Sequence, residues 1–131
     1  QQVMYIAQHG FPVTTEPDVD RLFGQGAYFH EDASEADKRS SDDKNGYYQG
    51  YFAMLLCRVT LGAVQVLQSP DAEAHLRVGP DKTFDSTMGM YGDRTSGTGM
   101  ARREFVISDL SRVYPEYAVI YERDEKRRRS I

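Results

Sequence analysis

Glu104-Phe105-Val106-Ile107 and, further along the chain, Tyr117-Ala118-Val119-Ile120-Tyr121 give its clearest secondary-structure signals. Both segments hold the β-branched and aromatic side chains that are typical of strands. A turn is expected between them, near Val113-Tyr114-Pro115. Pro115 has no backbone N–H to donate to a neighbouring strand, so we expect it to lie before the second strand and outside its ladder.

Two segments nearer the N-terminus are also expected to form strands. Ala27-Tyr28-Phe29 is short, whereas residues 52–61 form a long apolar run that predicts a central strand, buried on much of both faces and ending at Gly62. Residues 69–99 are rich in Gly and Pro, which predicts loops. Within that region, Phe84-Asp85-Ser86-Thr87 is a possible short strand.

Short helices are expected only in the first third of the chain. Apolar residues at helical spacing predict one over residues 3–9, which Gly10-Phe11-Pro12 would end. A second is expected over residues 33–39, with Asp32 or Ser34 as its N-cap. Because strands dominate and no strand–helix alternation recurs, the sequence predicts an α+β domain with a mainly antiparallel sheet.

Composition narrows the class of protein. A length of 131 residues predicts a single domain, and a net charge of -4 disfavours a dedicated nucleic-acid-binding protein. Cys57 is the only cysteine, so neither a disulfide nor a cysteine-based zinc site can form. No signal peptide or membrane span is recognisable, which predicts a nuclear or cytoplasmic protein. The basic run Lys126-Arg127-Arg128-Arg129 is expected to be a solvated tail, with nuclear targeting or polyanion binding as the alternatives.

Single residues remain ambiguous when they are taken alone. Gly24-x-Gly26 fits a tight turn better than a phosphate-binding loop, and Tyr28 fits a core aromatic residue. For Glu104, residue types favour a solvent-facing carboxylate paired with Arg102 or Arg103 over one that is partly buried for function. The three histidines have no metal-site spacing and are expected at the surface or at helix ends: His9, His30 and His75.

The order of several segments is more specific than any one of them. In sequence they are His9-Gly10-Phe11, Phe23-Gly24-Gln25-Gly26-Ala27-Tyr28-Phe29, Ala33-Ser34, Met54-Leu55-Leu56-Cys57-Arg58-Val59-Thr60-Leu61-Gly62, Phe84-Asp85-Ser86, Arg103-Glu104-Phe105-Val106 and Tyr114-Pro115-Glu116-Tyr117. This series resembles the catalytic domain of the poly(ADP-ribose) polymerase family, and it is especially similar to the tankyrase-like branch. The resemblance implies an ADP-ribosyltransferase-like fold with a split sheet over residues 1–121, followed by a charged tail over residues 122–131.

The same resemblance implies an activity and a set of site residues. The activity is NAD-dependent transfer of ADP-ribose to a protein side chain or a growing chain, with release of nicotinamide; no metal takes part, and the acceptor protein is open. Tyr28 would stack on nicotinamide, and Glu104 would accept a hydrogen bond from a hydroxyl of the nicotinamide ribose, which makes these two the catalytic candidates. Tyr28 and Phe29 are expected to contact NAD, as are the positions held by Ala36 and Arg39.

Departures from the family pattern leave a second function open. The family has a His-Gly-Thr or His-Gly-Ser strand that would precede Gln1. We therefore expect the chain to be a fragment of a longer protein. The alternative is a domain that lacks half of the residues that bind NAD. Ala36 replaces a Ser that binds the nicotinamide amide, and Arg39 replaces a second stacking Tyr. Tyr47 and Tyr48 could supply that ring or pack elsewhere. The alternative function is a catalytically silent domain that binds protein or ADP-ribose.

Overall fold

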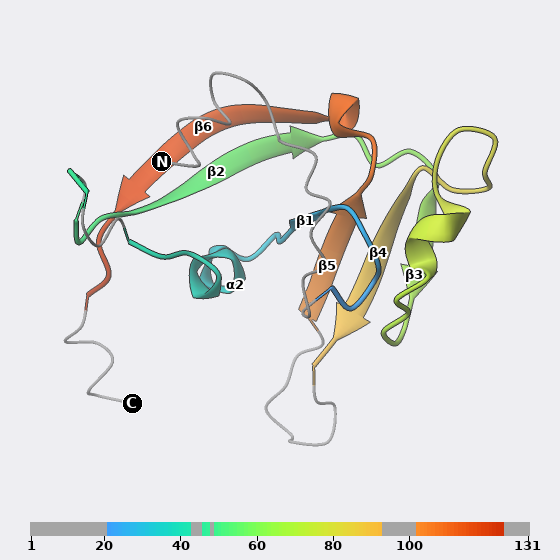
Figure 1. Ribbon diagram of the computed structural model, residues 1–131, viewed down its shortest axis with the longest axis horizontal. Helices are drawn as coiled ribbons and strands as arrows, with labels where there is room; N and C mark the ends of the chain where they lie inside the picture. Colours follow the sequence, from blue (N-terminus) through green and yellow to red (C-terminus); the bar gives the residue numbers. More distant parts are fainter. Residues whose placement is uncertain (1–20, 43–45, 48, 93–101, 125–131) are drawn as a thin grey trace.

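The computed structural model describes residues 21–42, 46–47, 49–92 and 102–124. Their strands form two sheets, one of four strands in the order β1-β5-β4-β3 and one made of β2 and β6 (Figure 1). Short helices beside mainly antiparallel sheets confirm the predicted α+β class with a split sheet. The elements are β1 (Ala27–Phe29), α2 (Ala33–Lys38), β2 (Phe52–Val59), β3 (Val64–Leu67), β4 (Ser86–Tyr91), β5 (Arg102–Ile107), β6 (Val113–Tyr121) and the 3-10 helices Ala74–Arg77 and Leu110–Arg112.

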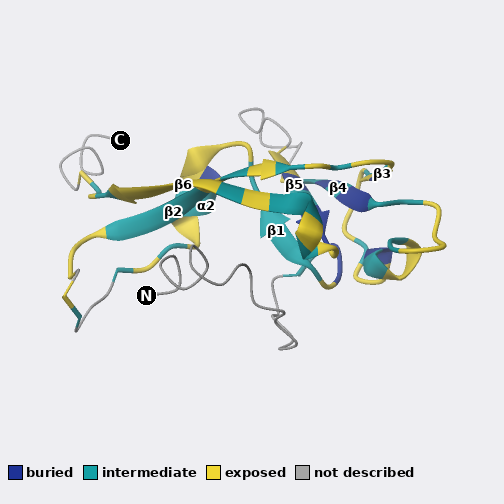
Figure 2. Ribbon diagram, turned by 90° about the horizontal axis from the view of Figure 1, so that it is seen from above, coloured by how far each residue is buried: buried dark blue, intermediate teal, exposed yellow. Residues whose placement is uncertain are grey.

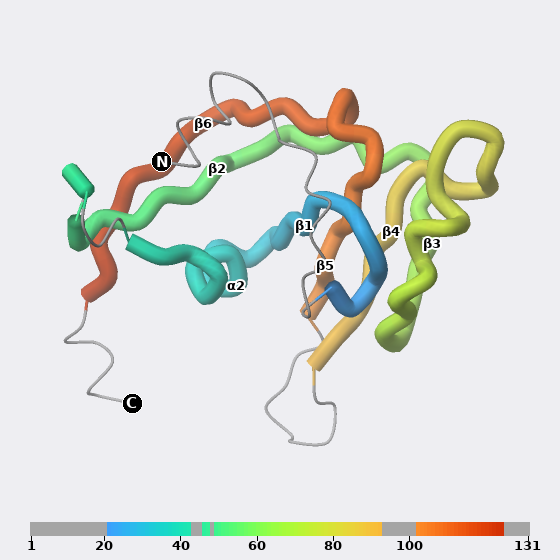
Figure 3. The backbone as a smooth tube through the Cα atoms, in the orientation of Figure 1, coloured from blue at the N-terminus to red at the C-terminus, as the bar shows by residue number. Residues whose placement is uncertain are grey.

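The path of the chain links the two sheets through α2. The tube in Figure 3 runs from β1 into α2, continues to β2 in the two-stranded sheet, and returns to β3 in the four-stranded sheet. Asp32 caps α2 as predicted, because its carboxylate accepts a hydrogen bond of 3.0 Å from the backbone N–H of Ser34. The helix ends at its C-cap residue, Arg39.

The four-stranded sheet holds the core and has β5 at its centre. β5 pairs antiparallel with both β1 and β4, and its residues Val106 and Ile107 are buried together with Phe23 and Ala74. Figure 2 shows the buried residues concentrated in this sheet, with β2 and β6 largely intermediate or exposed. The ring of Phe23 lies directly on Gly89 of β4: a Cβ added at that glycine would lie 2.2 Å from the ring. Only glycine admits so close an approach.

Residues 52–59 form the predicted strand β2, but the prediction that it is central and buried on both faces is wrong. Within the described residues, β2 pairs with β6 alone. No residue of β2 is fully buried, and Leu56 is 57% exposed. An apolar run indicates a preference for extended backbone and for burial. It does not indicate whether other parts of the fold cover both faces of the strand.

The expectation that Pro115 lies before its strand is also wrong. Pro115 is inside β6, opposite Cys57. The pairing then shifts, so that the next paired residues are Leu56 and Tyr117 and Glu116 has no partner of its own. This irregularity is a β-bulge, one of the places where a strand tolerates a residue that has no backbone N–H.

The region predicted as loops, residues 69–99, contains the strand β4, and a second unpredicted strand, β3, lies just before it. β3 has no counterpart in the sequence prediction, and β4 begins only at the end of the short strand suggested over residues 84–87. The two strands run parallel, and Gln65 donates a hydrogen bond of 3.1 Å to the hydroxyl of Thr87 between them. Two parallel strands need a long connection, so the sequence contains no hairpin turn that would predict their pairing.

Some predictions fall on residues outside the described ranges. They include the helix over residues 3–9 and the basic run Lys126-Arg127-Arg128-Arg129. Among the helices in the described part of the chain, none is both long and apolar enough to cross a membrane.

Candidate functional site

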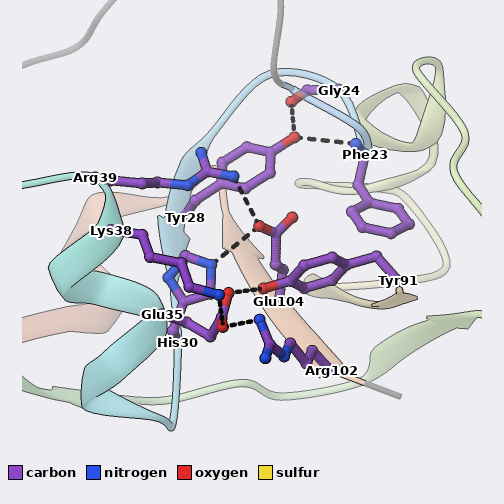
Figure 4. A network of polar contacts seen from close by, with 10 residues as sticks. All are labelled: Phe23, Gly24, Tyr28, His30, Glu35, Lys38, Arg39, Tyr91, Arg102 and Glu104. Atoms are coloured by element: carbon purple, nitrogen blue, oxygen red, sulfur yellow. Dashed lines mark hydrogen bonds and ion pairs between the residues drawn. The ribbon is translucent and has the colours of Figure 1, made fainter. Parts of the chain in front are cut away.

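The register of β1 against β5 brings the two catalytic candidates to one face of the four-stranded sheet. Tyr28 is opposite Val106, and side chains alternate along a strand, so Glu104 lies on the same face as both. Figure 4 shows the carboxylate of Glu104 beside the ring of Tyr28. Although they are separated by a long stretch of sequence, the two residues lie on one face of the sheet, which is the arrangement that the resemblance implies.

Glu104 is fully buried, and its two carboxylate oxygens differ in their contacts. Oε1 is 3.0 Å from Nε2 of His30 and 3.0 Å from Nη2 of Arg39 (Figure 4). Oε2 is buried as well, but it has no hydrogen-bond partner among the described residues. Because a buried polar atom without a partner costs free energy, this oxygen is a candidate point for binding a donor from outside the chain.

Tyr28 is held by its hydroxyl group. The hydroxyl donates a hydrogen bond of 2.6 Å to the carbonyl of Gly24 and accepts one of 3.1 Å from the N–H of Phe23. Burial is the main cause that raises the pKa of Tyr28, and the negative charge of Glu104 adds to it. The hydrogen bond from the Phe23 N–H acts in the opposite direction and lowers the pKa. The phenol therefore stays protonated and ties the ring to the glycine turn before β1.

A second buried carboxylate, that of Glu35 on α2, lies on the same side of the sheet (Figure 4). It accepts hydrogen bonds from Lys38 at 2.7 Å and from Tyr91 at 3.0 Å, and it pairs with Arg102. Burial opposes ionisation, but these hydrogen bonds and the two cations lower the pKa of Glu35. Burial and the Glu35 carboxylate raise the pKa of Tyr91 to about 12.

The arrangement overturns the simplest expectation for Glu104. That expectation was a solvent-facing carboxylate paired with Arg102 or Arg103, and it is wrong. Arg102 binds Glu35 instead, and Arg103 forms an exposed pair with Glu31 at 2.6 Å. The physical reason is strand alternation: Arg103 points to the opposite face, while Arg102 shares the face of Glu104 but pairs with the nearer carboxylate of α2.

His30 is the functional candidate that the sequence prediction missed. It was expected at the surface or at a helix end, yet its side chain is only 6% exposed and contacts Glu104. A signal was present, because His30 follows Tyr28 by two positions and strand alternation places both on one face. No other feature of the sequence distinguished it from His9 and His75.

The remaining predicted contact residues fall in different places. Phe29 is opposite Phe105, and strand alternation places both on the face away from Glu104. Both border a cavity of about 460 Å³ that extends to β2 and is also lined by Tyr28 and His30. Ala36 also borders this cavity. Tyr47 is 94% exposed and so does not pack in the core, and Tyr48 lies outside the described residues.

The described residues form no candidate metal site. In the described ranges, no three His, Cys, Asp or Glu side chains gather as metal ligands would.

The profile of the poly(ADP-ribose) polymerase catalytic domain matches residues 1–123, whereas no curated protein sequence matches the chain. The profile does not separate branches, so the tankyrase-like similarity stays a prediction. Since the match spans almost the whole chain, including Tyr28 and Glu104, the chain belongs to the poly(ADP-ribose) polymerase catalytic domain family.

Proposed function

We propose that the chain is the catalytic part of an NAD-dependent ADP-ribosyltransferase. The observation that carries the proposal is the carboxylate of Glu104, which is fully buried, shares a face with Tyr28, and has one oxygen without a partner among the described residues. A buried carboxylate with a free oxygen is suited to accept a hydrogen bond from a ribose hydroxyl. The residues present thus fit the nicotinamide ribose of NAD at this point.

The chemistry of NAD explains why a carboxylate is needed there. When the bond between ribose and nicotinamide breaks, the bonding electrons leave with nicotinamide and positive charge develops on the ribose. Glu104, fixed close to that charge in a site that excludes water, stabilises the transition state more than the ground state. The acceptor then forms a bond to the same ribose carbon and loses a proton.

Tyr28 supplies the second element of the site. Its ring offers an apolar surface on which nicotinamide would stack, and its two hydrogen bonds to the turn before β1 fix the orientation of that surface. A ring held in this way loses little conformational entropy when the ligand binds. Tyr28 would therefore position the leaving group while Glu104 acts on the ribose.

The acceptor is proposed to be a protein side chain in the nucleus or cytoplasm. A net charge of -4 gives the chain no overall attraction for nucleic acid, which supports a protein acceptor. Whether one ADP-ribose or a chain of them is transferred does not follow from these residues.

One observation favours the silent alternative, a domain that binds protein or ADP-ribose without catalysis. Arg39 stands where the family has a second stacking Tyr, and its guanidinium contacts the carboxylate on which catalysis depends. Ala36, in place of a Ser, has no hydroxyl to bind the nicotinamide amide. On this alternative the site is blocked and NAD binds weakly or not at all.

The test is to incubate the full-length protein that carries this chain with labelled NAD. We expect the wild type to incorporate label, and Glu104→Gln to reduce the rate about 10²- to 10³-fold, the loss typical when one preorganised electrostatic group is removed. Glu116→Gln is the matched control, because Glu116 lies in β6 in an ion pair with Arg58. Undiminished labelling by Glu104→Gln contradicts the proposal.

The silent alternative is separated from the active one by binding. Calorimetry with a non-cleavable NAD analogue should show heat of binding for the wild type under the proposed function. Little heat, no thermal shift and no label together support the silent domain.

A further inference from the structure

The two contacts to Oε1 of Glu104 come from different elements. His30 lies directly after β1, and Arg39 is the residue that ends α2. Both are 3.0 Å from the same oxygen, and neither contacts Oε2 (Figure 4). We name this pair of contacts the Oε1 clamp.

The clamp differs from an ordinary surface ion pair in its burial. Glu104 is fully buried, so its charge needs compensation that water cannot supply. Arg39 remains 45% exposed and reaches the carboxylate from the solvent side, whereas His30 reaches it from within the fold. The carboxylate is thus held between the residue that follows β1 and the residue that ends α2.

Holding one oxygen also orients the other. The last torsion of a glutamate side chain is broad and nearly two-fold, so an unrestrained carboxylate exchanges its two oxygens freely. Two donors that converge on Oε1 fix the plane of the group. Oε2 is then presented in one direction with its lone pairs unused, as a ribose hydroxyl would require.

We infer that Arg39 is a positioning residue, which acts with His30 through Oε1 so that Oε2 of Glu104 alone faces the ribose. The inference rests on the proposed function, because the ribose belongs to NAD. It also gives a reason for a cation at the position where the family has an aromatic ring. The positive charge of Arg39 is paired with the Glu104 carboxylate, so no unpaired cation faces the positively charged nicotinamide.

Two other roles for Arg39 lead to different kinetics. If Arg39 held a phosphate of NAD, its loss would raise KM for NAD and leave kcat nearly unchanged. If Arg39 only masked the charge of Glu104, its loss would raise kcat. A positioning role predicts a loss in kcat with little change in KM.

The kinetic experiment compares wild-type full-length protein with Arg39→Gln, Arg39→Lys and the control Arg103→Gln. Arg103→Gln is the same chemical change at the residue next to Glu104 in the sequence. Arg103, however, lies on the opposite face of the sheet, in an exposed ion pair with Glu31. We expect Arg39→Gln to lower kcat by about 10- to 100-fold, since misplacement by about 1 Å costs up to about 10²-fold. KM should change by less than about threefold, because the lost contact is to Glu104 and not to NAD.

The lysine variant tests the geometry of the contact. Lysine restores the charge without the planar fork, so Arg39→Lys should recover part of the lost kcat. The control should retain wild-type kinetics. Wild-type or raised kcat in Arg39→Gln, or an effect confined to KM, overturns the inference.

A measurement without NAD keeps the inference testable if the protein is silent. Thermal unfolding of Arg39→Gln, Glu104→Gln and the double variant forms a double-mutant cycle. The clamp predicts that Arg39→Gln lowers Tm clearly in the wild-type background and much less in the Glu104→Gln background. Additive shifts exclude the clamp. Coupled shifts with no labelling by the wild type retain the clamp and refute the proposed transferase.

Discussion

The two sheets differ in how they bury polar and apolar side chains. In the four-stranded sheet, polar residues are buried: Gln65, Ser86, Thr87 and Glu104. In the two-stranded sheet, large apolar residues are exposed: Leu56, Tyr114, Tyr117, Val119 and Ile120. The core therefore does not lie at β2, the strand with the most apolar sequence. It lies at β5, the strand that carries the Glu104 carboxylate.

The buried polar residues of the four-stranded sheet are nearly all satisfied. Gln65 donates to Thr87 and to the carbonyl of Ala74, and Ser86 donates to the carbonyl of Leu61. Against that background, Oε2 of Glu104 stands out as the buried side-chain atom without a partner in the described part of the chain. Burial of polar groups in this sheet thus serves the fold everywhere except at the one atom where function is proposed.

The largest expected contrast comes from one substitution made in each sheet. Ile107 in β5 is fully buried, and Ile120 in β6 is 54% exposed. Ile107→Ala should lower the free energy of unfolding by about 2–5 kcal/mol through lost burial and a cavity, whereas Ile120→Ala should cost less than about 1 kcal/mol. Urea unfolding of both variants measures the difference.

Equal costs would break the comparison. They would mean that a further layer covers β6 in the intact protein, and that its exposed apolar residues are buried by something outside the described chain. The m-value separates this outcome from a change in the denatured state.

A smaller effect is expected at the close contact between Phe23 and Gly89. Gly89→Ala places a methyl group against a fully buried ring and should cost about 1–3 kcal/mol, as overpacking of a core usually does. In a Phe23→Leu background the added methyl meets a smaller side chain, so the same change should cost less. Equal costs in both backgrounds would show that the ring is not the obstacle.

Local signals in the sequence were sufficient for the elements that build the site. The strand at residues 27–29, the helix capped by Asp32 and the strand that carries Glu104 are all present. Their side-chain alternation and caps depend on neighbouring residues alone. The order of motifs added the long-range pairing of Tyr28 with Glu104, which no local signal contains.

Features that depend on distant residues were missed. The parallel pairing of β3 with β4 joins segments with a long connection between them, and the bulge that accommodates Pro115 depends on its partner Cys57. The pairing of Arg39 with Glu104 is another case, because the sequence shows two charges but not which carboxylate each cation reaches. Such contacts are set by the packing of α2 on the sheet and not by either segment alone.

The buried carboxylate of Glu35 gives the four-stranded sheet a pH dependence. Hydrogen bonds and cations lower the pKa of Glu35 below its usual 4.5, despite burial. A lowered pKa stabilises the folded state above the usual value, and this stabilisation is lost as pH falls through the folded-state pKa. The stability difference between wild type and Glu35→Gln should therefore be constant near neutral pH and shrink below about pH 4.5. Urea unfolding across that range tests it, and a difference that persists unchanged into strong acid contradicts it.

The smallest effect is expected in the two-stranded sheet, from the pair formed by Arg58 and Glu116. Their side chains are 72% and 33% exposed, and the charged atoms lie 2.7 Å apart. Exposed pairs contribute little because water screens them and two flexible side chains must be ordered, so Arg58→Gln should cost at most about 0.5 kcal/mol. Salt should reduce even this cost, whereas the coupling of Arg39 with buried Glu104 should persist in salt. A cost at Arg58 as large as that at Arg39 would mean that burial does not separate the two sheets energetically.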